Sequence, residues 1–419
     1  MQPVERSFGN LISPVDPEEF LEHYWEKQYL HLERRQAGLY DHLFSLADVD
    51  RWIQGAKADD VDGVLMAPPE GSQVSVQRYR TGQLPIETAY EGFAKGHSLV
   101  LNRLESTWYP LAPLLEMLGE VFCARIGVNA YLTPVGSKTF PVHVDHHDAF
   151  ILQVYGEKVW RLHELRDQPV QRLQYQSDLE IPGLWGELES WPVIAEPVLR
   201  PGDLLYIPRG MPHSAIARDD SSLHLTISIN NLYWLDLVKA AAEQACFESP
   251  LLRRGLPPRF LSRPEAREEM RESFSRAMQE FQATASFEKA LRAVMHRTMR
   301  LQGYPRDGHL TQLVRLREIG LDSLVERRPG ALCMVECPAG QGICKILFAS
   351  AAVQGPARLR AAMEFIRDHD RFRVAELPGL GDESKPVLVR RLIREGLLRL
   401  AAAPVAAEAG ELARTASDR

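Results

Sequence analysis

The sequence of 419 residues is poor in cysteine and has no long hydrophobic run. No window comes near the roughly 18 uninterrupted apolar residues of a membrane-spanning helix. Residues 1–20 carry charge early and contain no apolar stretch, so they do not resemble a secretory signal. The five cysteines form no CxxC pair, and this odd-numbered set is typical of reduced thiols in a cytoplasmic protein. We therefore expect a cytoplasmic protein without a disulfide framework.

Three of the cysteines lie close together in the C-terminal part of the chain, at Cys333, Cys337 and Cys344. Cysteines at this spacing could bind a metal ion. Structural zinc sites, however, usually combine two close pairs of ligands, and no second pair accompanies these three residues. We therefore interpret them as unlinked thiols on strands.

The composition excludes a strong overall attraction to polyanions. The chain has 49 Lys and Arg against 56 Asp and Glu, a net charge of −7, so neither nucleic acid nor an anionic membrane attracts it as a whole. Its 45% hydrophobic and 25% charged residues are those of an ordinary globular protein. The length is sufficient for two or three domains with their own cores.

The residue pattern changes along the first half of the chain. Residues 16–60 read as short helices with loops, the first of which has an Asp cap followed by Pro and two Glu. A helical stretch follows over residues 98–125. From 126 to 232, short β-rich runs are broken by Gly and Pro, which predicts an antiparallel sandwich or barrel. We assign residues 1–232 to this mostly β domain with helical N-terminal elements.

The second half is helical first and mixed afterwards. Residues 233–300 have apolar residues at helical spacing, and because these faces need a partner we expect a homodimer, with docking on the barrel as the alternative. Residues 301–400 end in a hairpin, two helices and a closing strand, the order of a winged helix. Basic and acidic residues nearly balance there, so we do not expect DNA binding. For residues 401–419 we expect a disordered tail.

A cluster of histidines and aspartates stands directly before a buried strand, in the segment PVHVDHHDAFILQVYGEKVWRL. Burying such groups is unfavourable unless a partner such as a metal ion binds them. On a strand, His143 and Asp145 share a face, and His213 at the end of another strand is placed to join them. Two histidines and a carboxylate form the facial triad of non-haem Fe(II) oxygenases. The neighbouring His146 and His147 could supply the metal ligand in place of His143. In particular, His147 and Asp145 also share a strand face, so this pair stays open as an alternative.

A lysine and two polar strand faces indicate a ligand-holding interior beside this cluster. Lys158 follows the turn YGE, where a hairpin would direct its cation into the same interior. A cation there can hold a dicarboxylate by its far carboxylate. Two predicted strands each place polar residues on one face: Asn129, Tyr131 and Thr133 on the first, and His224, Thr226, Ser228 and Asn230 on the second.

The JmjC-type cupin ribosomal oxygenases, which are 2-oxoglutarate-dependent protein hydroxylases, are the family that this chain resembles. The resemblance lies in NAYLTPVGSKTFPVHVDHHDAFILQVYGEKVWRL, RPGDLLYIPRGMPHSA and SLHLTISI, and also in the N-terminal EEFLEHYWEKQYLHLERR. It implies a double-stranded β-helix of the cupin type over residues 1–232. It further implies a helical dimerisation region over 233–300 and a winged helix over 301–400.

The resemblance also implies the metal ligands. By position, His143, Asp145 and His213 would bind Fe(II) and form the catalytic centre. Val144 and His146 differ from the residues that we expect beside these ligands, close to where a substrate enters. The identity of the substrate therefore stays open.

The co-substrate residues follow from the same resemblance. Lys158 and Tyr131 would bind the C5 carboxylate of 2-oxoglutarate, and Ser228 would line the same pocket. Asn129 is a further candidate. Dioxygen is the other co-substrate that the resemblance implies.

The resulting hypothesis is an Fe(II)- and 2-oxoglutarate-dependent dioxygenase that hydroxylates a side chain of a ribosomal protein. One alternative is a hydroxylase that modifies the precursor peptide of a natural product. A cupin isomerase or a metal-binding module without oxidative chemistry is a third possibility. Lys158 argues against that third class, because such a cupin has no need of a buried cation.

Overall fold

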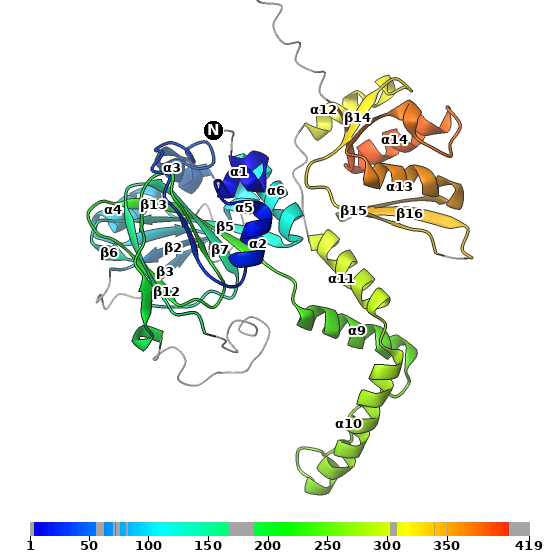
Figure 1. Cartoon of the computed structure of the whole chain (residues 1–419), viewed down its shortest axis with the longest axis horizontal. Coiled ribbons are helices and arrows are strands. Elements are labelled where there is room, and N and C mark those ends of the chain that lie inside the picture. Colours follow the sequence, from blue (N-terminus) through cyan, green and yellow to red (C-terminus); the bar gives the residue numbers. More distant parts are fainter. Residues whose placement is uncertain are drawn as a thin grey trace, which may run out of the picture. The chain divides into compact units, whose positions relative to one another are not determined.

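The computed structural model describes residues 4–55, 63–69, 72, 76–80, 83–166, 188–301, 308–338, 340–349 and 351–401 (Figure 1). The chain divides into two compact units, Met1–Thr298 and Met299–Arg419. The predicted tail lies outside the described residues except for Ala401. Among the helices that are described, none combines the length and the apolar character needed to cross a membrane.

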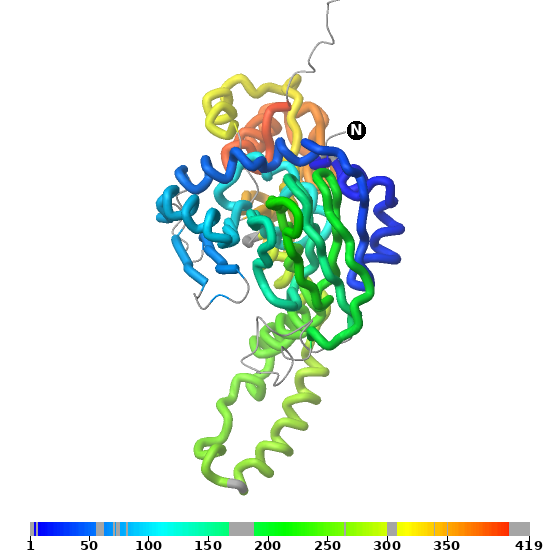
Figure 2. Tube along the Cα trace, turned by 90° about the vertical axis from the view of Figure 1, so that its left-hand side faces the viewer, coloured from blue at the N-terminus to red at the C-terminus, as the bar shows by residue number. Residues whose placement is uncertain are grey.

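Two antiparallel sheets form the centre of the first unit, as the β-rich pattern predicts (Figure 2). The larger sheet runs, in spatial order, through β1 (Leu30–Leu32), β11 (Leu204–Ile207), β7 (Asp148–Tyr155), β13 (Ser222–Asn230), β5 (Arg125–Thr133), β4 (Ser98–Leu101), β2 (Val64–Ala67) and β3 (Gln77–Tyr79). The smaller sheet runs through β10 (Val198–Leu199), β8 (Lys158–His163), β12 (His213–Ala217) and β6 (Ser137–Lys138), and β9 (Val193–Ala195) pairs with β8.

Short helices precede and interrupt these strands. They are α1 (Phe8–Ile12), α2 (Pro17–His23), α3 (Leu46–Gly55), α4 (Ile86–Ala94), α5 (Leu104–Thr107) and α6 (Ala112–Phe122), with 3-10 turns at Val4–Arg6, Tyr109–Leu111 and Leu188–Ser190. The predicted Asp cap is confirmed, since the carboxylate of Asp16 accepts a hydrogen bond from the N–H of Glu18 at 2.9 Å. The helix predicted from residue 98 is wrong at its start: Ser98–Leu101 forms β4, a strand that is buried throughout between β2 and β5.

Alternation along the central strands directs one face outward to the helices and the other face inward. The outward residues of β13 and β5 form one hydrophobic core with the N-terminal helices: Leu223, Leu225, Ile227 and Ile229 on β13, and Ile126, Val128, Ala130 and Leu132 on β5. β7 is buried on both faces, because Phe150 and Leu152 join this core while Ala149 and Ile151 join a second core that includes Trp160 of the smaller sheet. The polar residues of β13 and β5 are thereby directed toward the space between the sheets.

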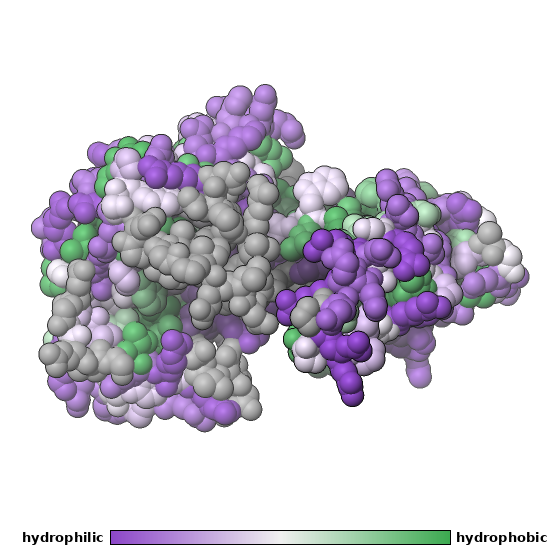
Figure 3. Space-filling view, turned by 90° about the horizontal axis from the view of Figure 1, so that it is seen from below, coloured by the Kyte–Doolittle hydropathy of each residue, from purple (hydrophilic) through white to green (hydrophobic). Residues whose placement is uncertain are grey.

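Three longer helices follow the sheets, α9 (Trp234–Glu248), α10 (Pro264–Thr284) and α11 (Phe287–Leu301), and the last of them ends just past the boundary of the first unit. They confirm the helical prediction for this segment. α9 and α11 share a small apolar cluster that includes Ala240, Ala290 and Val294. Many of their large apolar side chains nevertheless remain exposed, among them Trp234 (81%) and Phe247 (77%). On the face seen in Figure 3, hydrophobic residues (green) lie among hydrophilic ones (purple).

The second unit is a mixed α/β domain around its own core. Its helices are α12 (His309–Val314), α13 (Arg360–Asp368) and α14 (Ser384–Glu395), with 3-10 turns at Leu316–Glu318, Ala357–Leu359 and Val374–Glu376. One sheet runs through β18 (Arg371–Arg373), β14 (Leu324–Arg327) and β19 (Leu398–Leu400), the other through β15 (Cys333–Glu336), β16 (Ile343–Phe348) and β17 (Ala351–Pro356). The predicted hairpin, two helices and closing strand are all present.

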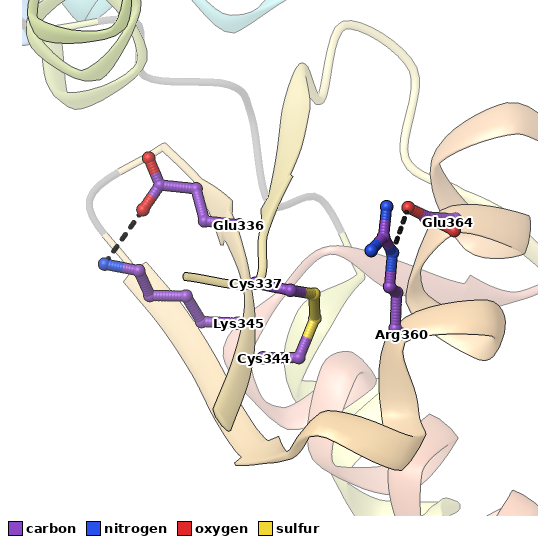
Figure 4. The surroundings of a disulfide bond; sticks show 6 residues. All are labelled: Glu336, Cys337, Cys344, Lys345, Arg360 and Glu364. Carbon is purple, nitrogen blue, oxygen red and sulfur yellow. Dashed lines mark hydrogen bonds and ion pairs between the residues drawn. A yellow bond between two sulfur atoms is a disulfide. The ribbon is translucent and has the colours of Figure 1, made fainter. Parts of the chain in front are cut away.

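A disulfide bond joins Cys337 and Cys344 in this unit (Figure 4). The register of the hairpin places Glu336 opposite Lys345, and their side chains form an ion pair at 2.9 Å. The next residues outward therefore face each other, with the Cα atoms of the two cysteines 4.2 Å apart. The interpretation as unlinked thiols is wrong for these two residues, because it did not take the strand register into account. Cys333 is a free thiol.

Candidate metal centre and its cavity

The two candidate ligands of the first segment precede β7 rather than lying on it. His143 forms an isolated antiparallel bridge with His213, the first residue of β12. Their backbones exchange two hydrogen bonds, of 3.1 and 2.9 Å. Asp145 is fixed in turn, because its carbonyl accepts a hydrogen bond from the N–H of Gly210 at 2.8 Å. Backbone pairing therefore brings the distant histidine to the HVD segment.

The three side chains converge on one point. One potential ligand atom each of His143, Asp145 and His213 lies within 4.8 Å of the others. The Nε2 atoms of the two histidines are 3.9 and 3.6 Å from the Asp145 carboxylate oxygens. Nδ1 of His143 lies 2.9 Å from the backbone carbonyl of Pro141, and Nδ1 of His213 lies 2.9 Å from that of Met211. Such a contact fixes the ring so that Nε2 is presented to a metal ion.

The electrostatics of the cluster suit metal binding. Burial alone would raise the pKa of Asp145. The charges of the surrounding histidines, led by His147 and His213, outweigh burial and lower this pKa to about 2. Burial and the neighbouring His143 lower the pKa of His213 to about 4. An ionised carboxylate and a neutral imidazole are the forms that bind a divalent cation. At neutral pH Asp145 and His213 are therefore in their metal-binding forms.

The competing histidines, His146 and His147, do not belong to the three-residue cluster. The rings of His146 and His147 contact each other, with centroids 5.1 Å apart. The backbone carbonyl of His146 accepts a hydrogen bond from the hydroxyl of Tyr233 at 3.0 Å. Nδ1 of His147 lies 3.4 Å from the carbonyl of Asp148. Among the described residues, neither histidine joins the group that could hold a metal ion.

A cavity between the two sheets opens beside the triad. It is lined by Tyr131, Thr139, Phe140, His143, Asp145, Ile151, Lys158, Trp160, His213, Ala215, His224 and Thr226. Lys158 is fully buried, and its Nζ donates a hydrogen bond to Thr133 Oγ1 at 2.9 Å. Burial lowers the pKa of Lys158 to about 7. A buried cation next to a neutral hydroxyl is a strong site for an anionic ligand.

The other predicted co-substrate residues divide into two groups. Tyr131 lines the cavity, where burial and the Asp145 charge raise the pKa of its hydroxyl. Ser228 and Asn129 are not among the lining residues. Ser228 donates a hydrogen bond to the carbonyl of Gly127 at 3.2 Å, and Asn129 accepts one from the N–H of Arg103 at 3.0 Å. Asn129 also hydrogen-bonds to Tyr131 and so reaches the cavity indirectly.

A buried polar network behind the triad was not predicted as part of the site. The Asp148 carboxylate accepts hydrogen bonds from the Tyr206 hydroxyl at 2.7 Å and from Asn231 Nδ2 at 3.0 Å. The Tyr206 hydroxyl accepts one from the N–H of Glu26 at 2.9 Å, and Glu26 pairs with Arg209 at 3.0 Å. Burial raises the pKa of Asp148 to about 6. The network anchors Asp148, the first residue of β7, close in the chain to the candidate ligand Asp145.

Comparison with known families places a JmjC domain at residues 107–237, which includes all three candidate ligands. Ribosomal oxygenase 1 of Rattus norvegicus is 34% identical over 272 residues, 61% of this chain and 43% of the relative. The bifunctional lysine-specific demethylase and histidyl-hydroxylase NO66 of Aedes aegypti is 32% identical over 266 residues, 60% of this chain and 39% of the relative. The chain thus matches less than half the length of these relatives.

A solved structure of Escherichia coli YcfD matches with a TM-score of 0.55 and 18% identity, over 92% of this chain and 98% of YcfD. Another YcfD structure, described as a ribosomal oxygenase in complex with cobalt and succinic acid, matches with a TM-score of 0.55 and 17% identity, over 93% and 99%. At this identity the match shows a shared fold. Residues 107–237 therefore match a JmjC domain, the chain shares the fold of YcfD, and about three fifths of its length is similar to the ribosomal oxygenases.

Proposed function

We propose that this protein is an Fe(II)- and 2-oxoglutarate-dependent oxygenase that hydroxylates a side chain of a protein. The observation that carries the proposal is one cavity that contains both a two-histidine, one-carboxylate cluster and a buried lysine. The cluster has the donor set of non-haem iron. The lysine has no carboxylate partner among the described residues, so the far carboxylate of a 2-oxo diacid fits beside it.

The roles of the residues follow from their positions. His143, Asp145 and His213 would hold the metal ion, and its further ligands would come from the cavity beside them. Lys158 holds the far carboxylate of 2-oxoglutarate, with the Tyr131 hydroxyl as a second donor. When bound, the iron and its co-substrate supply the oxidation of an unactivated C–H bond with dioxygen. The apolar walls around Ile151 exclude bulk water.

The proposed substrate is a ribosomal protein. The support is homology to proteins named ribosomal oxygenase and histidyl-hydroxylase. A hydroxylase of a natural-product precursor peptide would need the same iron site, and only the accepted substrate distinguishes the two. A cupin without oxidative chemistry is disfavoured, because Lys158 would then be a buried cation without a use.

The test is turnover by the purified chain with Fe(II) and 2-oxoglutarate. We expect succinate formation that rises when ribosomal proteins are added, and an added oxygen atom on one of them by mass spectrometry. The weak absorbance of the iron chelate of 2-oxoglutarate is the second readout. The absence of both succinate and the absorbance would refute the proposal, whereas a precursor peptide as the preferred substrate would favour the alternative.

We also propose that the protein is a homodimer formed through α9, α10 and α11. The support is the exposed apolar surface on these helices, which includes Trp234, Phe247, Phe274 and Phe287. Two-fold self-association is the commonest way to bury such a surface. Light scattering at micromolar concentration should give twice the chain mass of 47.4 kDa. A monomeric mass would refute the dimer.

For the remaining parts we keep the sequence-based assignment as a proposal: a catalytic domain over 1–232, a dimerisation region over 233–300 and a winged helix over 301–400. We propose that the winged helix has a structural or partner-contacting role rather than binding DNA. Retention of the isolated unit on duplex DNA in a salt-dependent manner would contradict this.

A cytoplasmic location is likewise proposed, and fractionation of cells that express the protein tests it.

A further inference from the structure

His224 lies in the wall of the cavity, in contact with the rings of Tyr131 and Trp160. It faces Tyr131 across the pairing of β13 with β5. The two rings stack in parallel, with centroids 4.9 Å and planes 2° apart. On its other side His224 meets the ring of Trp160 edge to face, at 5.4 Å. The imidazole is therefore held rigidly in the wall of the cavity.

The hydrogen-bonding capacity of the His224 ring is not fully used within the described part of the chain. His224 is 2% exposed, and among the described residues its Nδ1 has no hydrogen-bond partner. The indole Nε1 of Trp160, also in the cavity wall, is likewise without a partner there. Buried polar atoms in proteins are almost always paired, so two unpaired nitrogens in one wall indicate a polar ligand.

The charge state of His224 suits a neutral donor beside a cation. Burial, and then the nearby Lys158 charge, lower the pKa of His224 well below its ordinary value. A neutral imidazole has one N–H donor and one acceptor nitrogen. It can therefore add a hydrogen bond to an anion already held by Lys158 without repelling that cation. A second cation at this position would oppose the first.

We propose that His224 is a further co-substrate-binding residue, whose imidazole N–H donates a hydrogen bond to the far carboxylate of 2-oxoglutarate next to Lys158. This inference rests on the proposed function, because it names a residue of the same site. The ring also stacks on Tyr131 and so positions the tyrosine beside the carboxylate. A purely structural histidine would position Tyr131 but would not bind the carboxylate.

The variants His224→Phe and His224→Gln distinguish carboxylate binding from positioning of Tyr131. Phenylalanine keeps an aromatic ring against Tyr131 but removes both nitrogens, whereas glutamine loses the ring and restores an N–H donor. Binding of 2-oxoglutarate and of 2-oxopentanoate, which lacks the far carboxylate, is measured by calorimetry on Mn(II)-loaded protein. His31→Phe is the matched control, because His31 is a partly buried histidine of β1 outside this cavity.

For His224→Phe we expect 2-oxoglutarate affinity to fall roughly 10- to 100-fold, the loss of one hydrogen bond to a charged group. Affinity for 2-oxopentanoate should stay within about twofold, and His224→Gln should regain part of the 2-oxoglutarate affinity. An unchanged 2-oxoglutarate affinity, an equal loss for both acids, or a larger loss in the Gln variant would overturn the inference. If the unsubstituted protein binds no 2-oxoglutarate, the proposed function itself fails instead.

Discussion

The backbones of His143 and His213 hydrogen-bond to each other in both directions, at 3.1 and 2.9 Å. Two candidate ligands that lie far apart in the sequence are therefore brought together by strand pairing. The carbonyl contacts of their Nδ1 atoms then orient the rings toward Asp145. The fold itself thus positions the three side chains of the candidate metal site.

Replacing Asp145 by Ala should remove metal binding without unfolding the protein. The carboxylate is the only anionic ligand of the three, while the bridge between His143 and His213 does not depend on it. We expect the dissociation constant for Co(II) to rise by more than about 100-fold, above the range for altered outer-shell partners. Calorimetry measures the affinity, and an unchanged circular dichroism spectrum confirms the fold. Co(II) bound as tightly as before would place the site elsewhere.

Replacing His146 or His147 by Ala should leave metal binding and turnover largely intact, because neither joins the cluster. His143→Ala is the paired variant and should abolish both. Succinate release and Co(II) titration of the three variants provide the comparison. If His147 proved essential and His143 dispensable, the ligand set would be His147, Asp145 and His213 instead.

Binding of 2-oxoglutarate should weaken above a pH of about 7. Burial lowers the pKa of Lys158 to about 7, so its cation is lost as the pH rises through that value. A neutral lysine must take up a proton to pair with the carboxylate, and affinity should fall up to tenfold per pH unit. The facing groups do not titrate in this range: burial lowers the pKa of His224 and raises that of Tyr131.

Lys158→Arg tests that assignment, since a guanidinium stays charged throughout. Dissociation constants of the Mn(II)-loaded protein between about pH 6.5 and 8.5 should rise steeply for the unsubstituted chain and stay nearly flat for the variant. The same pH dependence in both proteins would assign the titration to another group.

Replacing Tyr206 by Phe should destabilise the first unit. Its hydroxyl donates to the buried Asp148 and accepts from the N–H of Glu26, so the change removes one hydrogen bond from each of these two residues. The expected loss is about 1–3 kcal/mol of unfolding free energy, measured by urea denaturation. Tyr155→Phe serves as the control, because Tyr155 lies on the same sheet and is 43% exposed. Equal midpoints for the two variants would show that the network contributes nothing.

Much of the site was predictable because it depends on residue type and spacing. The HVD segment, a downstream His213 and a lysine after a turn are local patterns, and a period of two along β5 and β13 predicts which residues face the interior. The strand itself was placed too early, since β7 begins at Asp148 and backbone pairing with His213 aligns the ligands instead.

What could not be predicted depends on pairing between distant segments. The contact of His224 with Tyr131 requires the exact register of β13 against β5. The same holds for the disulfide, because only the hairpin register shows that Cys337 faces Cys344. A sequence read alone supplies periodicity within each strand but not the offset between two strands.

The measurement that tests the account most directly is 2-oxoglutarate binding to Mn(II)-loaded protein with and without Lys158→Ala. The triad is untouched, so metal affinity should stay within about threefold, while loss of the buried charge pair should weaken 2-oxoglutarate by tens- to thousands-fold, about 2–5 kcal/mol. Equal 2-oxoglutarate affinity in the two proteins would contradict the assignment of this cavity to a 2-oxo diacid beside the metal.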